Sequence, residues 1–149
     1  MFGVRKQFSK RLHYGHDEKA RAAAKAYWKT QGYYAIDNPN TKGVDLLLVD
    51  PETDEVVGYV EVEVKNNWSA KKFQYETLQI PERKGKYLAL YGKKIRYMVF
   101  SKDLTQALII SSLALRRSPL VEVSNKFVRK GEYFYQVPVK KCQLVSMEE

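Results

Sequence analysis

Cysteine is nearly absent from this 149-residue sequence, and long apolar runs are missing. Cys142 is the only thiol, so one chain can form neither an internal disulfide nor a multi-thiolate zinc site. No apolar run approaches the roughly 20 residues that a membrane span needs, and the basic start leads into no stretch that resembles a signal peptide. We therefore expect a soluble, cytoplasmic protein that is not secreted and has no membrane partner.

Two further absences narrow the chemistry. The sequence has no glycine-rich phosphate loop, so we expect no use of nucleoside triphosphates. Its two histidines, His13 and His16, form a pair that is too sparse to hold a metal without partners.

Positive charge is the main feature of the composition. The chain carries 26 Lys and Arg against 17 Asp and Glu, a formal net charge of +9, which favours polyanionic partners. Because the basic residues alternate with Tyr and Trp rather than lying on one amphipathic helix, we expect nucleic acid rather than a membrane surface as the partner.

The order of elements indicates an α/β or α+β fold with a mixed central sheet and helices on both faces. The length suits one domain, which we place at residues 17–149 after a basic arm at 1–16. The expected elements are a helix from 17 through 28, a hairpin over 43–65 with its turn at 50–54, a short helix or structured loop over 69–80, a helix between Pro81 and Gly92, a strand over 94–101, a helix over 103–115, and strands over 120–145 with a turn at 129–132.

The second strand of the expected hairpin, Tyr-Val-Glu-Val-Glu-Val-Lys at 59–65, has an unusual pattern. Side chains alternate along a strand, so Glu61, Glu63 and Lys65 share one face and the valines share the other. An amphipathic strand with a solvated charged face would show the same alternation. The first strand adds Asp45, the sole charge at the start of the apolar run 44–49.

Antiparallel pairing about the turn at 50–54 places Asp45 opposite a position between Val60 and Glu63. Opposed or diagonal side chains lie close enough to share a site, and carboxylates this close repel one another. A hard divalent cation with oxygen ligands, Mg²⁺ or Mn²⁺, would relieve the repulsion. Such an ion beside Lys65 suits phosphodiester hydrolysis, with the lysine orienting the attacking water.

Asp45 at a strand start, a turn, and then Glu63-Val64-Lys65 resemble the PD-(D/E)xK nuclease superfamily over roughly residues 17–115. The resemblance implies a restriction-endonuclease-like core of a helix, a three-strand meander, a helix and a further strand, here with an added helix and C-terminal strands. It implies Asp45 and Glu63 as metal ligands, the Val64 carbonyl as a third, and Lys65 as the catalytic lysine.

Two carboxylates have open roles. Many members of the superfamily carry a glutamate on the first helix, where Glu18 stands here, although a charge at a helix start is also common. Glu61 would either help to bind a second ion or be the more exposed neighbour of the site. The chain departs from the superfamily pattern in having Val44 where proline is usual. It also lacks the QxxxY signature of exonuclease members, because Tyr75 follows Gln74 directly, which favours an endonuclease such as the small junction-resolving or restriction-type members.

Basic and aromatic residues after the motif suggest a nucleic-acid surface. Lys and Arg would neutralise phosphates, and Trp68 or Tyr75 would stack on an unpaired or distorted base, unless Trp68 and Phe73 are core residues. The expected contacts are Trp68, Lys71, Lys72, Arg83, Lys84 and Lys86.

The sequence thus predicts a Mg²⁺-dependent DNA endonuclease acting on double-stranded or branched DNA. A homodimer is expected if two strands are to be cut, with the apolar segment 104–115 or the aromatic C-terminal strands as its interface. A non-catalytic DNA-binding module on the same scaffold, or an RNA-directed nuclease, would share the basic surface.

Overall fold

The computed structural model describes residues 18–69, 73–125 and 128–147. In these residues the strands form two sheets, one with the strand order β1-β2-β3-β5-β6-β9 and one with the order β4-β8-β7. The first contains β1 (Tyr34–Asp37), β2 (Leu46–Val49), β3 (Val56–Lys65), β5 (Ile95–Ser101), β6 (Gln106–Ser111) and β9 (Gln143–Ser146). The second contains β4 (Thr77–Pro81), β7 (Leu120–Asn125) and β8 (Val128–Pro138).

One longer helix precedes these strands, and short helices connect them. An N-terminal helix covers residues 18–30, while the expected helix between Pro81 and Gly92 is divided into η1 (Glu82–Gly85) and α2 (Lys86–Tyr91). The others are η2 (Gly92–Lys94), α3 (Ser112–Arg116) and η3 (Val139–Lys141). Among the described residues, no helix has the length and apolarity to cross a membrane.

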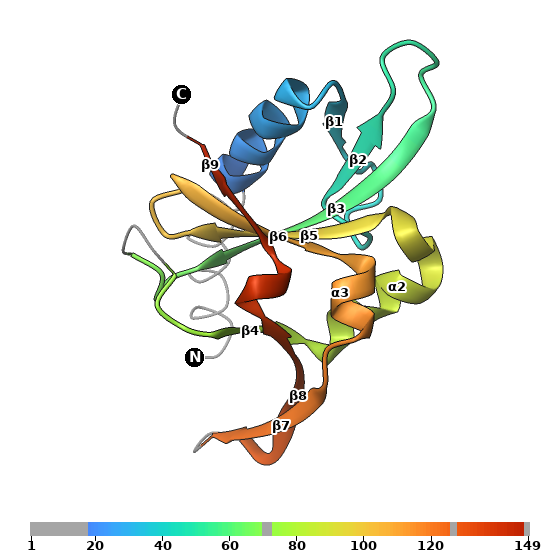
Figure 1. Cartoon of the computed structure of the whole chain (residues 1–149). Coiled ribbons are helices and arrows are strands. Elements are labelled where there is room, and N and C mark those ends of the chain that lie inside the picture. The colour runs from blue at the N-terminus through green and yellow to red at the C-terminus, as the bar shows by residue number, and fades with distance from the viewer. Residues whose placement is uncertain (1–17, 70–72, 126–127, 148–149) are drawn as a thin grey trace, which may run out of the picture.

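The six-stranded sheet lies between two apolar layers, which confirms the expected mixed α/β architecture with helices on both faces. Ala20, Ala24 and Trp28 of the N-terminal helix pack on one face, against the valines of β3 and alternate residues of β5. The opposite face is covered by β4, α2, α3 and β8 (Figure 1). The small alanine side chains let the helix approach the sheet closely.

The meander β1-β2-β3 positions the site. β2 and β3 are antiparallel, with Leu46 opposite Val60, and β3 continues as a parallel neighbour of β5 as far as the pair Lys65–Ser101. The hairpin over 43–65 is therefore confirmed. The strand β1 was not among the expected elements. It is four residues long and mostly exposed, so its sequence need not alternate between apolar and polar residues.

The segment 103–115 is not one helix, as the sequence suggested. It contains the strand β6 and only a short helix, α3. Residues 107–110 are all buried because β6 lies inside the sheet between β5 and β9, and such a continuous apolar run has no period that separates strand from helix. Asp103, expected as a helix cap, instead accepts hydrogen bonds from the hydroxyls of Ser101 and Thr105 at 2.8 Å in the β5–β6 turn. Because residues 107–110 are buried within the sheet, they are not available as a dimer interface; the homodimer itself stays a prediction.

Two smaller expectations also differ from the structure. Residues 129–132 were expected to form a turn but lie within β8, where Glu132 pairs with Val123 of β7. The segment 69–80 was expected to be a short helix or loop, yet from Thr77 it forms β4, which pairs with β8. The partner strand is about 60 residues away along the chain, and no local pattern specifies it.

Gly92 ends α2, as the sequence predicted, and has φ 56° and ψ −127°. No heavy atom lies within 4 Å of the place where a Cβ would stand, so a side chain has room and only the backbone conformation is unfavourable. We expect Gly92→Ala to lower the free energy of unfolding by about 1–3 kcal/mol, measured by urea denaturation. Gly43→Ala is not a suitable control, because its Cβ would lie 2.8 Å from the Asn38 amide. An unchanged stability would contradict the positive φ at Gly92.

Candidate active site

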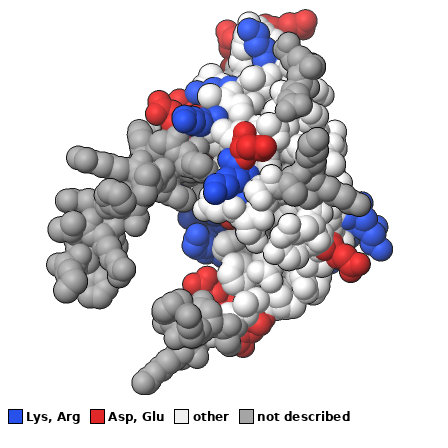
Figure 2. Space-filling model, turned by 90° about the vertical axis from the view of Figure 1, so that its left-hand side faces the viewer, with Lys and Arg blue, Asp and Glu red and all other residues white. Residues whose placement is uncertain are grey.

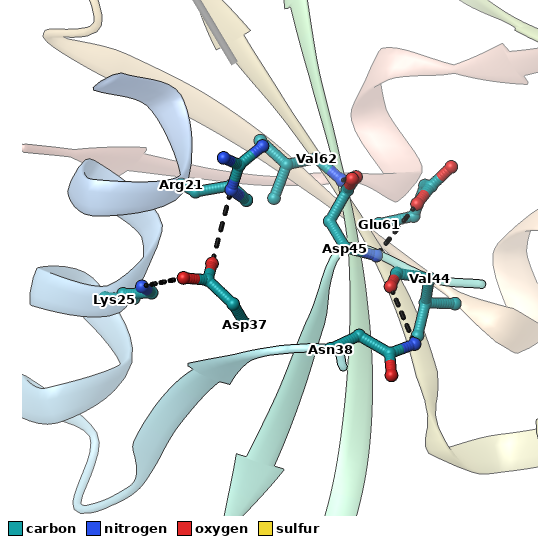
Figure 3. Close-up of polar contacts among 8 residues, drawn as sticks. All are labelled: Arg21, Lys25, Asp37, Asn38, Val44, Asp45, Glu61 and Val62. Atoms are coloured by element: carbon teal, nitrogen blue, oxygen red, sulfur yellow. Dashed lines mark hydrogen bonds and ion pairs between the residues drawn. The ribbon is translucent and has the colours of Figure 1, made fainter. Parts of the chain in front are cut away.

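Asp45 precedes β2, and its carboxylate is held against β3. Its Oδ2 accepts a hydrogen bond of 2.8 Å from the Val62 backbone N–H, while its own backbone N–H donates to Glu61 Oε1 at 3.2 Å (Figure 3). The approach to Asp45 is also fixed, because the Asn38 amide donates to the Val44 carbonyl at 2.9 Å. The carboxylate is therefore held by the backbone of β3, and the backbone on either side of Asp45 is held by the side chains of Glu61 and Asn38.

The charged face of β3 is confirmed. Val60 and Val62 are buried beneath the N-terminal helix, so Glu61, Glu63 and Lys65 point to the opposite side of the sheet. Since Leu46 pairs with Val60, Asp45 stands across from Glu61, within the range that the hairpin predicted. Glu61 is 7% exposed, which corrects the alternative that it is the more exposed neighbour of the site.

The buried carboxylate of Glu61 has an ion-pair partner. Lys84 Nζ lies 2.9 Å from Glu61 Oε2, and the hydroxyl of Tyr97 donates to the Lys84 carbonyl, which ties η1 to the sheet. Burial, followed by the hydrogen bond and charge of Asp45, raises the pKa of Glu61 to about 7 although Lys84 opposes the shift. Burial would lower the pKa of Lys84, but attraction to Glu61, Glu63 and Asp45 raises it overall.

Glu63 and Lys65 form a second pair further along β3. Lys65 Nζ lies 3.4 Å from Glu63 Oε1 and donates to the Gln79 carbonyl of β4 at 3.1 Å. Both side chains are half-buried, 26% and 23% exposed, so their charged ends are held in place while solvent or a ligand can still reach them.

The donors at this edge suit a hard cation. In a strand, the N–H and C=O of one residue point to the same edge, and every second residue points to that same edge. Because the Val62 N–H faces Asp45, the Val64 carbonyl faces that same edge of β3. In the described residues no three His, Cys, Asp or Glu side chains are arranged to hold a metal ion. The ligand set of Asp45, Glu63, Val64 and Glu61 therefore remains a prediction, and it depends on a backbone oxygen.

Several residues expected to contact nucleic acid have other positions. Trp68 is 1% exposed and packs edge-on against Phe73, so its expected stacking on a base is wrong and the core alternative is correct. Lys84 is paired with Glu61 and is not part of an open phosphate-binding surface. Arg83 and Lys86 are exposed on η1 and α2. Lys71, Lys72 and the arm at 1–16 lie outside the described residues.

Glu18 is exposed at the start of the described N-terminal helix. The buried face of that helix packs on the valine side of β3, opposite the face that carries Glu61 and Glu63. A place for Glu18 in the same site thus gains no support from the fold. Nearby, Asp37 of β1 pairs with Arg21 at 3.3 Å and Lys25 at 2.9 Å, which fixes the helix to the meander (Figure 3).

The role of Lys84 could not be read from the sequence. It was expected only as one of several basic residues, and no motif links it to Glu61, 23 positions earlier. The surface charges are likewise mixed: one face of the molecule shows Lys and Arg side chains interspersed with Asp and Glu (Figure 2). The described residues that are visible on that face form no continuous basic surface.

Comparison with known proteins gives limited information. No protein-family model matches the sequence. No curated protein matches it either. A solved structure of D212, a nuclease from a fusselovirus, is similar over 96% of this chain and 87% of that chain, with 14% sequence identity and a TM-score of 0.47.

Proposed function

We propose that this protein is a divalent-metal-dependent DNA endonuclease whose working residues are Asp45, Glu63 and Lys65. One observation supports the proposal above the others: the Asp45 carboxylate is held by the Val62 N–H at 2.8 Å, beside a strand face that carries two glutamates and a lysine. A merely solvated charged face would not bury Glu61 or fix the Asp45 carboxylate on the backbone.

Asp45, Glu63 and the Val64 carbonyl would hold Mg²⁺ or Mn²⁺, with Glu61 behind them. When bound, the ion would supply positive charge to a phosphate oxygen and lower the pKa of a bound water. Lys65, held between Glu63 and the Gln79 carbonyl, would orient the attacking water and stabilise the negative charge that develops on the phosphate. As the water oxygen gives up a proton and bonds to phosphorus, one P–O ester bond breaks and the departing oxygen takes up a proton.

Positive charge supports a nucleic-acid substrate. The net charge of +9 already includes the carboxylates of the site. Arg83 and Lys86 are exposed on η1 and α2, which follow β4. Binding through phosphates weakens steeply with salt, so we expect the affinity for DNA to fall between 50 and 200 mM salt.

A nicking assay tests this function. Supercoiled plasmid is incubated with the wild type and Mg²⁺, Mn²⁺, Ca²⁺ or EDTA. We expect nicking with Mg²⁺ and Mn²⁺ and none with Ca²⁺ or EDTA. Lys65→Met should reduce nicking by about 100-fold or more, while Lys140→Met, which removes an exposed lysine on η3, should leave it unchanged. Equal nicking by Lys65→Met and wild type would contradict the role of Lys65.

The two alternative functions give different results in the same assay. If the wild type binds DNA but cuts with none of the ions, the chain is a binding module on this scaffold. If matched RNA is cut and DNA is not, it is an RNA-directed nuclease. Duplex, single-stranded and branched substrates should be compared side by side.

A further inference from the structure

A hollow lies directly beside Lys65. It has a volume of about 280 Å³, and its walls come from the end of β3, the segment before β4 and β4 itself. The residues that matter for its chemistry are Lys65, Asn67, Phe73, Tyr75, Thr77 and Gln79. A ligand in this pocket would touch the same lysine that we place at the reacting phosphate.

One wall of the pocket is the aromatic ring of Tyr75, which packs against buried rings of the core. Trp68 contacts Phe73 edge-on at 5.2 Å between ring centroids, and Phe73 contacts Tyr75 at 5.6 Å. Exposure rises along this series from 1% for Trp68 and 8% for Phe73 to 48% for Tyr75. Tyr75 is thus anchored to the core through two buried rings, yet the residue stays exposed, so that its ring can meet a flat partner.

Apart from Leu78, the remaining described walls are polar but carry little charge. Asn67 and Gln79 have amide groups, and Thr77 has a hydroxyl that accepts a 3.5 Å hydrogen bond from the Gln136 amide. Among the described lining residues, Lys65 is the only one with a charged side chain. Amides and a hydroxyl can donate to and accept from the edge of a nucleobase, and Lys65 can meet the phosphate attached to it.

The size of the pocket limits what can enter. Its volume of about 280 Å³ is just below the range for small-molecule sites, about 300–1,000 Å³, which suits one base and not a stacked pair. In a duplex the Watson–Crick edge of a base is occupied by its partner and its two faces are covered by the neighbouring bases, so a paired base can neither enter the pocket nor stack on Tyr75. Only a nucleotide that is unpaired or flipped out of the duplex would fit.

We propose that this pocket binds one unpaired nucleobase of the substrate strand, stacked on Tyr75, so that the adjoining phosphate lies at Lys65. The proposal rests on the proposed function and specifies its substrate as DNA with an unpaired nucleotide, such as a single strand, a gap or a branch point. A fully paired duplex would bind through its phosphates alone.

Binding without cleavage tests the pocket. Fluorescence anisotropy in Ca²⁺ should compare a paired duplex, the same duplex with one unpaired nucleotide, and the single strand. Tyr75→Ala should weaken the two unpaired probes by roughly 5- to 150-fold and leave the duplex unchanged, and Tyr75→Phe should bind like the wild type. Tyr133→Ala is the matched control, because Tyr133 is also 48% exposed but lies on β8.

A photocrosslink gives a second, independent result. A single 5-iodouracil at the unpaired position should attach to Tyr75, identified by mass spectrometry of the wild-type protein. Equal loss of all three probes in Tyr75→Ala, or a crosslink confined to residues outside the pocket, would overturn the proposal. These readouts need no cleavage: a protein that binds through Tyr75 but never cuts contradicts only the nuclease function, whereas one that cuts but has no Tyr75-dependent preference contradicts only the pocket.

Discussion

Asp45→Asn is expected to reduce Mg²⁺-dependent nicking by about 1,000-fold or more, equivalent to about 4 kcal/mol of transition-state stabilisation. The substitution removes one charge and almost no volume. The asparagine Oδ1 can still accept the hydrogen bond that Asp45 accepts from the Val62 N–H, so the hairpin should stay intact. The loss of activity would therefore be due to the loss of the negative charge that binds the cation.

Asp50→Asn is the matched control for this variant. Asp50 lies in the turn of the same hairpin, where its Oδ1 accepts a 2.8 Å hydrogen bond from the Glu52 N–H, so the two substitutions make the same change in similar settings. Nicking should be measured with melting temperature, which we expect to be unchanged or slightly higher in Asp45→Asn because it relieves repulsion from Glu61. Comparable activity of Asp45→Asn and Asp50→Asn would contradict a metal role for Asp45.

Lys84→Met is expected to lower the free energy of unfolding in EDTA by about 3–5 kcal/mol at pH 8. The methionine keeps most of the side-chain volume but leaves the Glu61 carboxylate, 7% exposed, without its partner at 2.9 Å. Lys93→Met, at an exposed position of η2, should change stability little. Urea denaturation measures both variants. If Lys84→Met is as stable as the wild type, the ion pair does not hold η1 against the sheet.

The loss in Lys84→Met should depend on pH. The pKa of Glu61 is raised by burial and by Asp45 to about 7, so the native state binds a proton that the unfolded state releases near its ordinary pKa. Stability contributed by this group is present at low pH and is lost as pH rises toward 7. Removing Lys84 raises this pKa further, so the defect should be smaller at pH 5 than at pH 8, and the double variant Lys84→Met/Glu61→Gln should recover much of the loss. A defect of equal size at both pH values would contradict the protonation of Glu61.

The geometry around Asp45 was predictable because it depends on strand periodicity and one short connection. Alternation along 59–65 fixed the face of Glu61 and Glu63, and the turn at 50–54 limited the register to a few choices. The position of Asp45 across from Glu61 follows from these two local constraints. The fold class followed in the same way from the order of the elements.

The parts that the sequence did not predict depend on long-range packing. Residues 107–110 form a strand because β5 and β9 flank them, and Trp68 is buried because Phe73 and the second sheet cover it. Lys84 is a site residue because η1 brings it back over β3. In each case the deciding partner is distant in sequence, and the local residues fit more than one environment.

A cation shared between β2 and β3 is the central feature of the proposed site, and anomalous diffraction from a crystal soaked in Mn²⁺ would test it directly. We expect one strong manganese peak within bonding distance of the Asp45 and Glu63 carboxylates and the Val64 carbonyl, about 2.0–2.3 Å for hard-cation oxygen ligands. A peak at another place on the protein, or full Mn²⁺ occupancy in the Asp45→Asn crystal, would contradict it.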